Sequence, residues 1–173
     1  MPSFLIRINN KRTWDREAYA EWLDIGQAPA DVFRDLRVAE GILSVWHIEN
    51  DRSNLNLVVA ALAATRQSFD VFDYALFNQE LTSSSDIKFL ATAGDTPIPS
   101  ANLWHRDLTA LTANKLSVLV NTLFDVIEKE RISKQEVKSL IVEAARDGKI
   151  EFALTNDVLR PQILTLIGSA KSG

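Results

Sequence analysis

Apolar and polar residues alternate along two segments within the first fifty positions. In residues 3–9, Phe4, Ile6 and Ile8 fall on one side, and residues 42–49 repeat the same alternation around Trp46. A period of two is typical of a β-strand that buries one face. We therefore predict strands at 3–9 and 42–49, whose apolar positions face a common core.

The segment between these two strands has helical spacing instead. Trp14, Ala18 and Trp22 recur on one helical face after Thr13, whose hydroxyl suits an N-cap. Gly26 interrupts this pattern, and a second helical piece of about residues 30–39 follows. The first crossover is thus predicted to contain two short helices.

Two more strands and another helix are predicted between residues 54 and 93. A polar turn at 50–53 precedes a Leu-, Val- and Ala-rich segment at 54–65, which favours a hairpin with the second strand. Ser68 can cap a helix that runs to about Leu81, and residues 87–93 follow as a fourth strand. The resulting order β-α-β-β-α-β predicts a ferredoxin-like α+β fold.

The remainder of the chain is predicted to be a linker followed by helices. Pro97 and Pro99 make residues 94–108 resemble a linker between a sheet domain at 1–93 and a helical region at 109–173. Ser133 and Glu136 form a capping box that opens one of about three C-terminal helices.

The first of these helices, at about 114–130, is apolar on more than one side. A helix of this kind is typically covered by more than its own polypeptide. We expect it to contact a partner protein or a second copy of the chain through an apolar face formed by Leu116, Leu119, Val120, Leu123, Phe124 and Ile127.

Composition removes several classes of function. The 173 residues contain no Cys and two His, His47 and His105, which are far apart in sequence, so we expect no metal and no cofactor. A net charge of −4 without a basic stripe argues against nucleic acid as a partner. The longest apolar run, residues 57–64, is too short to span a membrane, and Arg7 interrupts any secretory segment at the start. We expect a soluble cytoplasmic protein.

A candidate binding face follows from the predicted sheet. Arg7, His47 and Asn56 would lie on its polar side if the first three strands pair in register. An arginine stabilises a bound anion and a histidine transfers a proton, so Arg7 and His47 are the candidate catalytic residues and Asn56 a further ligand-binding residue. The alternative is that this face is polar because it contacts solvent or a partner chain.

The middle of the chain, from Gly41 to about Ala93, resembles muconolactone isomerase and related small ferredoxin-like proteins. The matching features are Trp46-His47-Ile48, Asn54 at the predicted third strand, and Asp86-Ile87 before the fourth. The resemblance implies a cavity between sheet and helices, no cofactor, and assembly into oligomers.

Two classes of function follow from these observations, and whether the chain is an enzyme stays open. The first is a non-catalytic interaction or regulatory protein that self-associates through a sheet face and the apolar helix. The second is a cofactor-free small-molecule binder or isomerase-like enzyme with a pocket on the sheet face. The first is preferred, because it requires no catalytic motif and the sequence shows none.

Overall fold

The computed structural model describes residues 3–8, 14–36, 38–80, 86–125 and 128–169. Within these residues, six strands form one antiparallel sheet in the order β4-β5-β2-β1-β3-β6. The strands are β1 (Ser3–Ile8), β2 (Leu43–Ile48), β3 (Phe72–Asn78), β4 (Lys88–Ala91), β5 (His105–Thr109) and β6 (Glu128–Ile132). The helices are η2 (Glu17–Tyr19), α1 (Ala20–Leu23), α2 (Ala30–Leu36), α3 (Leu55–Ala64), α5 (Pro99–Asn102), α6 (Ala113–Asp125), α7 (Lys134–Arg146), η3 (Phe152–Leu154) and α8 (Arg160–Ser169).

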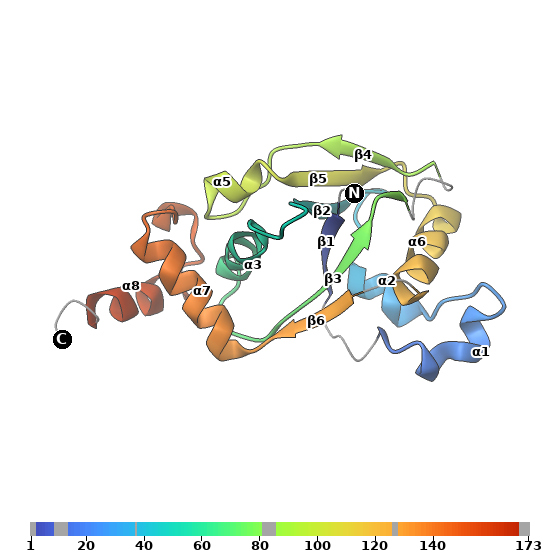
Figure 1. The fold of residues 1–173 in the computed structure, drawn as a ribbon, viewed down its shortest axis with the longest axis horizontal. Helices are drawn as coiled ribbons and strands as arrows, with labels where there is room; N and C mark the ends of the chain where they lie inside the picture. The colour runs from blue at the N-terminus through green and yellow to red at the C-terminus, as the bar shows by residue number, and fades with distance from the viewer. Residues whose placement is uncertain (1–2, 9–13, 37, 81–85, 126–127, 170–173) are drawn as a thin grey trace.

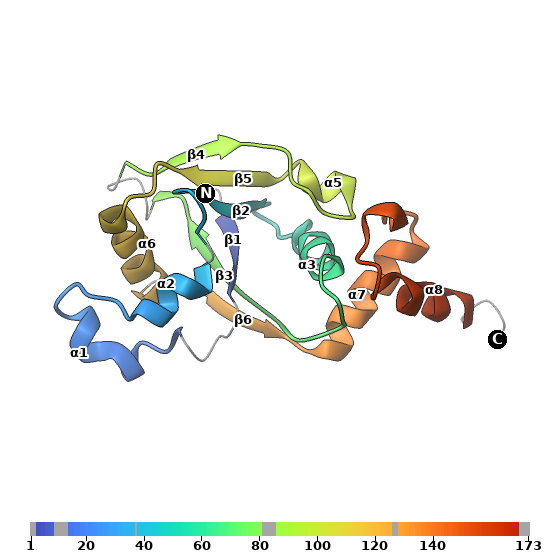
Figure 2. The same cartoon turned by 180° about the vertical axis from the view of Figure 1, so that it is seen from behind.

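Helices cover both faces of this sheet (Figure 1). On one side, α3 packs over Leu5, Trp46 and Ile48, and α5, α7 and α8 extend the same hydrophobic core around α3; we name this side the α3 face. On the other side, α1, α2 and α6 pack over alternate residues of the same strands, beginning with Phe4 and Val45, and we name it the α6 face. Figure 2 shows the same division from behind. Two hydrophobic cores, one on each face, therefore stabilise the chain.

The α+β class and the first elements are confirmed. Strand β1 covers the described part of the predicted strand at 3–9, and β2 covers most of 42–49. The two short helices α1 and α2 form the predicted two-piece connection, although the strands that it joins, β1 and β2, are antiparallel. Asn9 and the proposed N-cap Thr13 lie outside the described residues.

The predicted third strand at 54–65 is wrong, because this segment is helix α3. Seven successive residues, 58–64, are buried, so this part of the helix is enclosed on every side and needs no polar face. A continuous apolar run does not distinguish a buried strand from a buried helix, and the high Ala content favours the helix.

The predicted helix after Ser68 is also wrong. Residues 72–78 form strand β3, which lies between β1 and β6 and is buried from Phe72 to Phe77. A strand buried on both faces has no polar alternation, which explains why its aromatic residues resemble a helical face. Leu81 lies outside the described residues.

The fourth predicted strand, at 87–93, is confirmed over the shorter range of β4. The chain after it, however, is not only a linker and helices. Strand β5 pairs with both β2 and β4, and β6 pairs with β3. The proposed segments 1–93, 94–108 and 109–173 therefore all supply strands to one sheet, and the element order differs from β-α-β-β-α-β.

The helix predicted from the capping box is confirmed as α7. The Ser133 hydroxyl accepts a hydrogen bond from the Glu136 backbone N–H at 3.2 Å, and the Glu136 carboxylate accepts one from the Ser133 N–H at 2.9 Å. Helix α7 packs on α3 and α8. The C-terminal region thus contains helices α6, α7 and α8, but β6 separates the first from the other two.

Candidate functional site

The two central strands β1 and β2 pair over only part of their length. Their register ends where Leu5 lies opposite Trp46. Beyond this point β1 continues on β3 as far as Ile8, whereas β2 begins at Leu43 on β5. Within the described residues, the two strands are therefore unpaired at this end, and the sheet opens between them.

A pocket of about 460 Å³ occupies this opening. Its walls are largely apolar and come from β1, β2, α3, the end of α2 and the connection between α2 and β2: Ile6, Leu36, Ala39, Ile42, Leu43, Trp46 and Leu62. The polar lining residues are Arg7, Asp35, Glu40 and Ser44. An apolar hollow with a few polar groups is the usual form of a small-molecule site, which makes this pocket the candidate site.

Arg7 provides positive charge in this pocket. It lies two residues after Leu5 on β1, so its side chain leaves the sheet on the α3 face. The residue is half-buried, and the apolar side chains of Trp46 and Leu62 line the same pocket. A guanidinium in such partly desolvated surroundings attracts an anion more strongly than it does in bulk water.

Asp35 of α2 is a buried acid that lines this pocket. Its side chain is nearly inaccessible, and its Oδ2 accepts a hydrogen bond from the Trp14 indole N–H at 2.7 Å. This bond links α2 to the segment that precedes η2. One oxygen of Asp35 therefore stabilises the contact between these two segments.

The second acid, Glu40, lies in a tight turn. Ala39 and Ile42 exchange backbone hydrogen bonds of 3.0 and 2.8 Å across it. The φ angles are 52° at Glu40 and 73° at Gly41, as in a two-residue turn of type I′. Glycine and asparagine adopt such angles readily, whereas glutamate is strained. The turn thus keeps an acid beside the pocket at a cost in backbone energy.

Ser44 connects the pocket to a network of hydrogen bonds on the α3 face. Its hydroxyl donates to Asp107 Oδ1 at 3.2 Å, and the Thr92 hydroxyl donates to Asp107 Oδ2 at 2.8 Å. The same Thr92 oxygen lies 2.8 Å from Nδ1 of His105. Because the Thr92 proton goes to Asp107, Nδ1 of His105 has to donate to Thr92. The network thus fixes the imidazole with its proton on Nδ1.

His105 is buried behind the pocket wall. Burial lowers the pKa of its imidazole, an effect that the nearby Asp107 carboxylate partly opposes. Nε2 of the ring lies 3.7 Å from Asp107 Oδ1. His105 is therefore uncharged at neutral pH.

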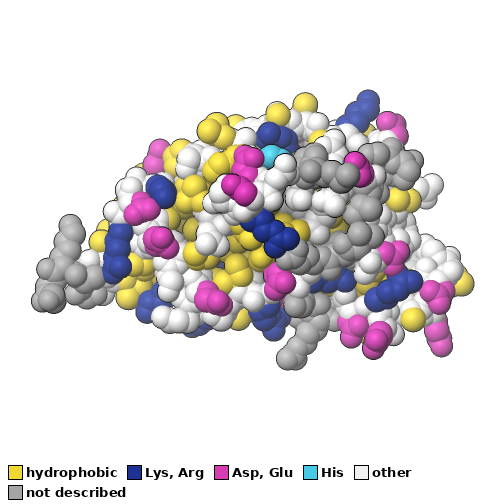
Figure 3. All heavy atoms as spheres, in the orientation of Figure 1, with side chains coloured by type: hydrophobic (Ala, Val, Ile, Leu, Met, Phe, Trp, Pro, Cys, Tyr) yellow, Lys and Arg dark blue, Asp and Glu magenta, His cyan; other side chains and the backbone are white. Residues whose placement is uncertain are grey.

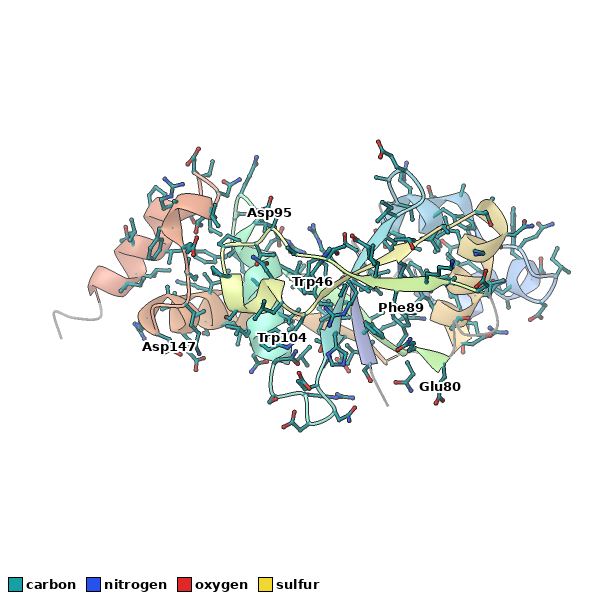
Figure 4. All side chains as sticks on the ribbon, turned by 90° about the horizontal axis from the view of Figure 1, so that it is seen from above. Trp46, Glu80, Phe89, Asp95, Trp104 and Asp147 are labelled. Atoms are coloured by element: carbon teal, nitrogen blue, oxygen red, sulfur yellow. The ribbon has the colours of Figure 1, made fainter. Side chains whose placement is uncertain are left out.

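Trp46 separates His105 from the pocket. Its ring meets the imidazole edge to face, with the ring centres 4.8 Å apart. The indole N–H is buried and makes no hydrogen bond with any described residue. Figure 4 shows Trp46 near the middle of the molecule, where the strands approach α3. Trp46 thus lines the pocket and also contacts the ring of His105.

The predicted site of Arg7, His47 and Asn56 is not assembled. His47 lies opposite Phe4 in the register and contacts its ring at 5.7 Å, so it is on the α6 face, whereas Arg7 is on the α3 face. The prediction is wrong because β1 and β2 pair in a register that sends these two side chains to opposite sides.

Asn56 is also far from its predicted role. It is exposed on helix α3 and lines a shallow hollow beside α7, together with Leu140 and Glu143. The sequence placed Asn56 on a sheet face because it predicted a strand at 54–65, where the structure has helix α3. As a residue of α3 it does not line the Arg7 pocket.

The predicted apolar interface helix is α6, and its main apolar face is not available to a partner. Leu119, Val120, Leu123 and Phe124 are buried in the core of the α6 face, and Leu116 packs against that core. Ile127 lies outside the described residues. The chain's own sheet covers this side of the helix, which corrects the prediction for these residues.

Ser44 and Asp107 belong to the candidate site, although neither is predicted from the sequence. Pro97 and Pro99 make residues 94–108 resemble a linker, which hides β5. A signal is nevertheless present, because His105 and Asp107 are two positions apart, as are Ser44 and Trp46. In paired strands such residues share one face, and the register indeed places Ser44 opposite Asp107 and Trp46 opposite His105.

Figure 3 shows hydrophobic side chains at the surface near the middle of the molecule, with acidic and basic side chains around them.

Among the described residues, no group of three or more His, Asp or Glu side chains is arranged to hold a metal ion. No helix in the described part of the chain is long and apolar enough to cross a membrane.

Comparison of the chain with protein-family models, with curated proteins and with solved structures finds no match.

Proposed function

We propose that this chain binds a small organic anion in the pocket between β1 and β2. The observation that carries the proposal is the end of β1–β2 pairing at Leu5 and Trp46, which opens a pocket beside Arg7. The apolar walls would hold the body of the ligand, and the guanidinium would bind its acidic group. Small-molecule binding is the second, less preferred class of function considered from the sequence, and of its predicted residues Arg7 alone lines this pocket.

The proposal is binding rather than isomerisation. The isomerase-like hypothesis required Arg7 and His47 to act on one ligand, and these residues lie on opposite faces of the sheet. His105 is uncharged and lies behind Trp46, so no described histidine lines the pocket.

Calorimetric titration with small carboxylates tests this proposal. Hexanoate, benzoate and 3-phenylpropionate are compared with the alcohols of the same carbon skeletons. We expect the acids to bind about tenfold or more tightly than the alcohols, because a charge-assisted hydrogen bond to arginine contributes roughly 1.5–3 kcal/mol. Arg7→Met keeps the apolar stem of the side chain and is expected to abolish this preference.

Two further variants complete the experiment. Arg34→Met removes an exposed arginine of α2 that does not line the pocket, so binding should be unchanged. Ala39→Phe fills the pocket without altering its charge and should weaken every ligand. If no carboxylate binds, or if Arg7→Met binds them as the unmodified protein does, the proposal is wrong.

Self-association is a second candidate function, and a contrast between the two sheet edges favours it. The β6 edge carries Lys129, Glu130 and Arg131, whose charges discourage pairing with another strand. The β4 edge has the sequence Lys-Phe-Leu-Ala, and Leu90 is 55% exposed. Among the described residues, β4 pairs with β5 alone. A second copy could add its own β4 at this edge.

Light scattering over a wide concentration range tests this second function. A dimer that becomes a folded monomer in Leu90→Lys, with a circular dichroism spectrum like that of the unmodified protein, would support pairing through β4. Val118→Lys is the matched control, since Val118 is also exposed but lies on α6. A monomer at all concentrations would exclude this candidate.

A further inference from the structure

We infer that the ligand is a zwitterion with an apolar body, namely an amino acid with an apolar side chain. The inference rests on the proposed function and specifies its ligand. A simple anion would need positive charge alone, yet the described lining contains acids as well as Arg7. Charges of both signs beside apolar walls match a molecule that carries a carboxylate, an ammonium and an apolar group.

Glu40 is the acid best suited to the ammonium. Asp35 is buried and already accepts the indole N–H of Trp14. Glu40 is exposed, and within the described residues its carboxylate has no hydrogen bond or ion pair. A bound ammonium could therefore form an ion pair with the Glu40 carboxylate without breaking a hydrogen bond of the fold.

The backbone at Glu40 supports this role. A residue with φ of 52° in a two-residue turn would be less strained as asparagine or glycine. Strain at a pocket wall is an observation from which function can be inferred, because the same turn would be more stable without the glutamate. The turn also fixes the distance of residue 40 from β2, since Ala39 and Ile42 are hydrogen-bonded across it.

Ser44 adds a second acceptor for the ammonium. Its hydroxyl proton is donated to Asp107, so the remaining lone pairs of Oγ can only accept hydrogen bonds. Thr92 supports the same Asp107 carboxylate and keeps it in place. The wall formed by Ser44 and Glu40 therefore offers acceptors, whereas Arg7 offers donors.

The pocket is large enough for such a molecule. Its volume of about 460 Å³ lies within the roughly 300–1,000 Å³ that is usual for small-molecule sites. The lining includes Trp46, Ile42 and Leu62, which suit an aromatic or branched aliphatic side chain.

The experiment compares L-phenylalanine with two analogues that each lack one charge, 3-phenylpropionate and phenethylamine, by calorimetric titration of the full chain. We expect L-phenylalanine to bind about tenfold or more tightly than either analogue. The pair L-leucine and 4-methylpentanoate repeats the comparison without an aromatic ring. In Glu40→Gln, the advantage of the amino acid over the acid should disappear.

Variants at residue 40 separate recognition from folding. Glu40→Asn removes the charge and relieves the strained φ, so it should raise the melting temperature and also lose the preference for the amino acid. Glu21→Gln, an exposed acid of α1 outside the pocket, should change neither property.

The outcomes distinguish this inference from the proposed function. If 3-phenylpropionate binds as tightly as L-phenylalanine and both depend on Arg7, the ligand is a simple anion, and the inference is wrong while the proposed function holds. If the preference for the amino acid survives in Glu40→Gln, the assignment of Glu40 is wrong. If no compound binds, both the inference and the proposed function fail.

Discussion

The two faces of the sheet differ in chemistry although the same strands form both. On the α6 face, the two central strands and β5 contribute mainly aliphatic and aromatic side chains, which pack on α2 and α6: Phe4, Ile6, Ile8, Leu43, Val45 and Leu108. On the α3 face, Ser44, His105 and Asp107 lie beside Trp46, and their polar atoms bond to one another.

This difference separates stability from binding within one sheet. The α6 face buries apolar area almost continuously, so it contributes mainly to the free energy of folding. The α3 face is fully covered by α3 at one end, whereas its other end carries the polar network and the pocket. A sheet that is stable on one face tolerates polar groups and an opening on the other.

Among the variants that test this difference, truncation of Leu123 should lower the free energy of unfolding most. Leu123 of α6 is fully buried in the core of the α6 face. We expect Leu123→Ala to lower the free energy of unfolding by about 3–4 kcal/mol, because it removes buried methyl groups and leaves a cavity. Urea denaturation measures the loss. Val118→Ala, on the exposed side of the same helix, should cost less than about 0.5 kcal/mol. Similar small losses at both positions would place α6 outside the core.

The charged pair of the α6 face should give the next largest effect. Asp73 is buried, and both of its oxygens accept hydrogen bonds from Arg131 of β6, at 2.8 and 2.6 Å. We expect Arg131→Met to cost roughly 2–3 kcal/mol, because it leaves a buried carboxylate with less compensation. Arg131 is itself 38% exposed at its side chain, which keeps the loss below that of a fully buried pair.

The exposed pair Arg34–Asp31 is the control for this variant. Both side chains are largely in solvent, so Arg34→Met should cost less than about 0.5 kcal/mol in the same denaturation experiment. Equal losses at Arg131 and Arg34 would show that the β3–β6 pair does not behave as a buried one.

The smallest expected effect is a pH dependence from the α3 face. Burial lowers the pKa of His105 in the folded chain, so below its ordinary value near 6.5 the unfolded state binds the proton more readily. The stability contributed by uncharged His105 is therefore present above pH 6.5 and is lost as pH falls below it. We expect the free energy of unfolding of His105→Asn to fall less between pH 7.5 and pH 5.5 than that of the unmodified protein. If the variant and the unmodified protein lose the same free energy of unfolding between these two pH values, His105 is not the group responsible.

Local sequence signals predicted the elements whose structure depends on residues close in sequence and on a single buried face. Strands β1 and β2 each follow an alternation of apolar residues, and α7 begins at a capping box whose hydrogen bonds involve Ser133 and Glu136 alone. Such signals depend on the residues themselves and on one buried side, so a single sequence contains them.

The elements that were predicted wrongly are those enclosed on all sides. Helix α3 and strand β3 are both apolar without a clear period, because α3 lies between the sheet and α7 and β3 lies between two strands. Their exchange in the prediction placed Asn56 on the sheet, whereas it lies on helix α3, and hid the neighbours of Arg7. Total burial removes the polar face from which a period is read.

The sequence by itself determined the α+β class, the two central strands, the capping box at Ser133 and the presence of Arg7 on a strand. The tertiary structure decided which side of the sheet each side chain occupies, since a shift of one residue in the register exchanges the faces. It also decided where β1 and β2 separate, and so where a pocket exists. Pairing between distant strands depends on contacts that no local pattern records, and the meeting of Ser44 with Asp107 is such a contact.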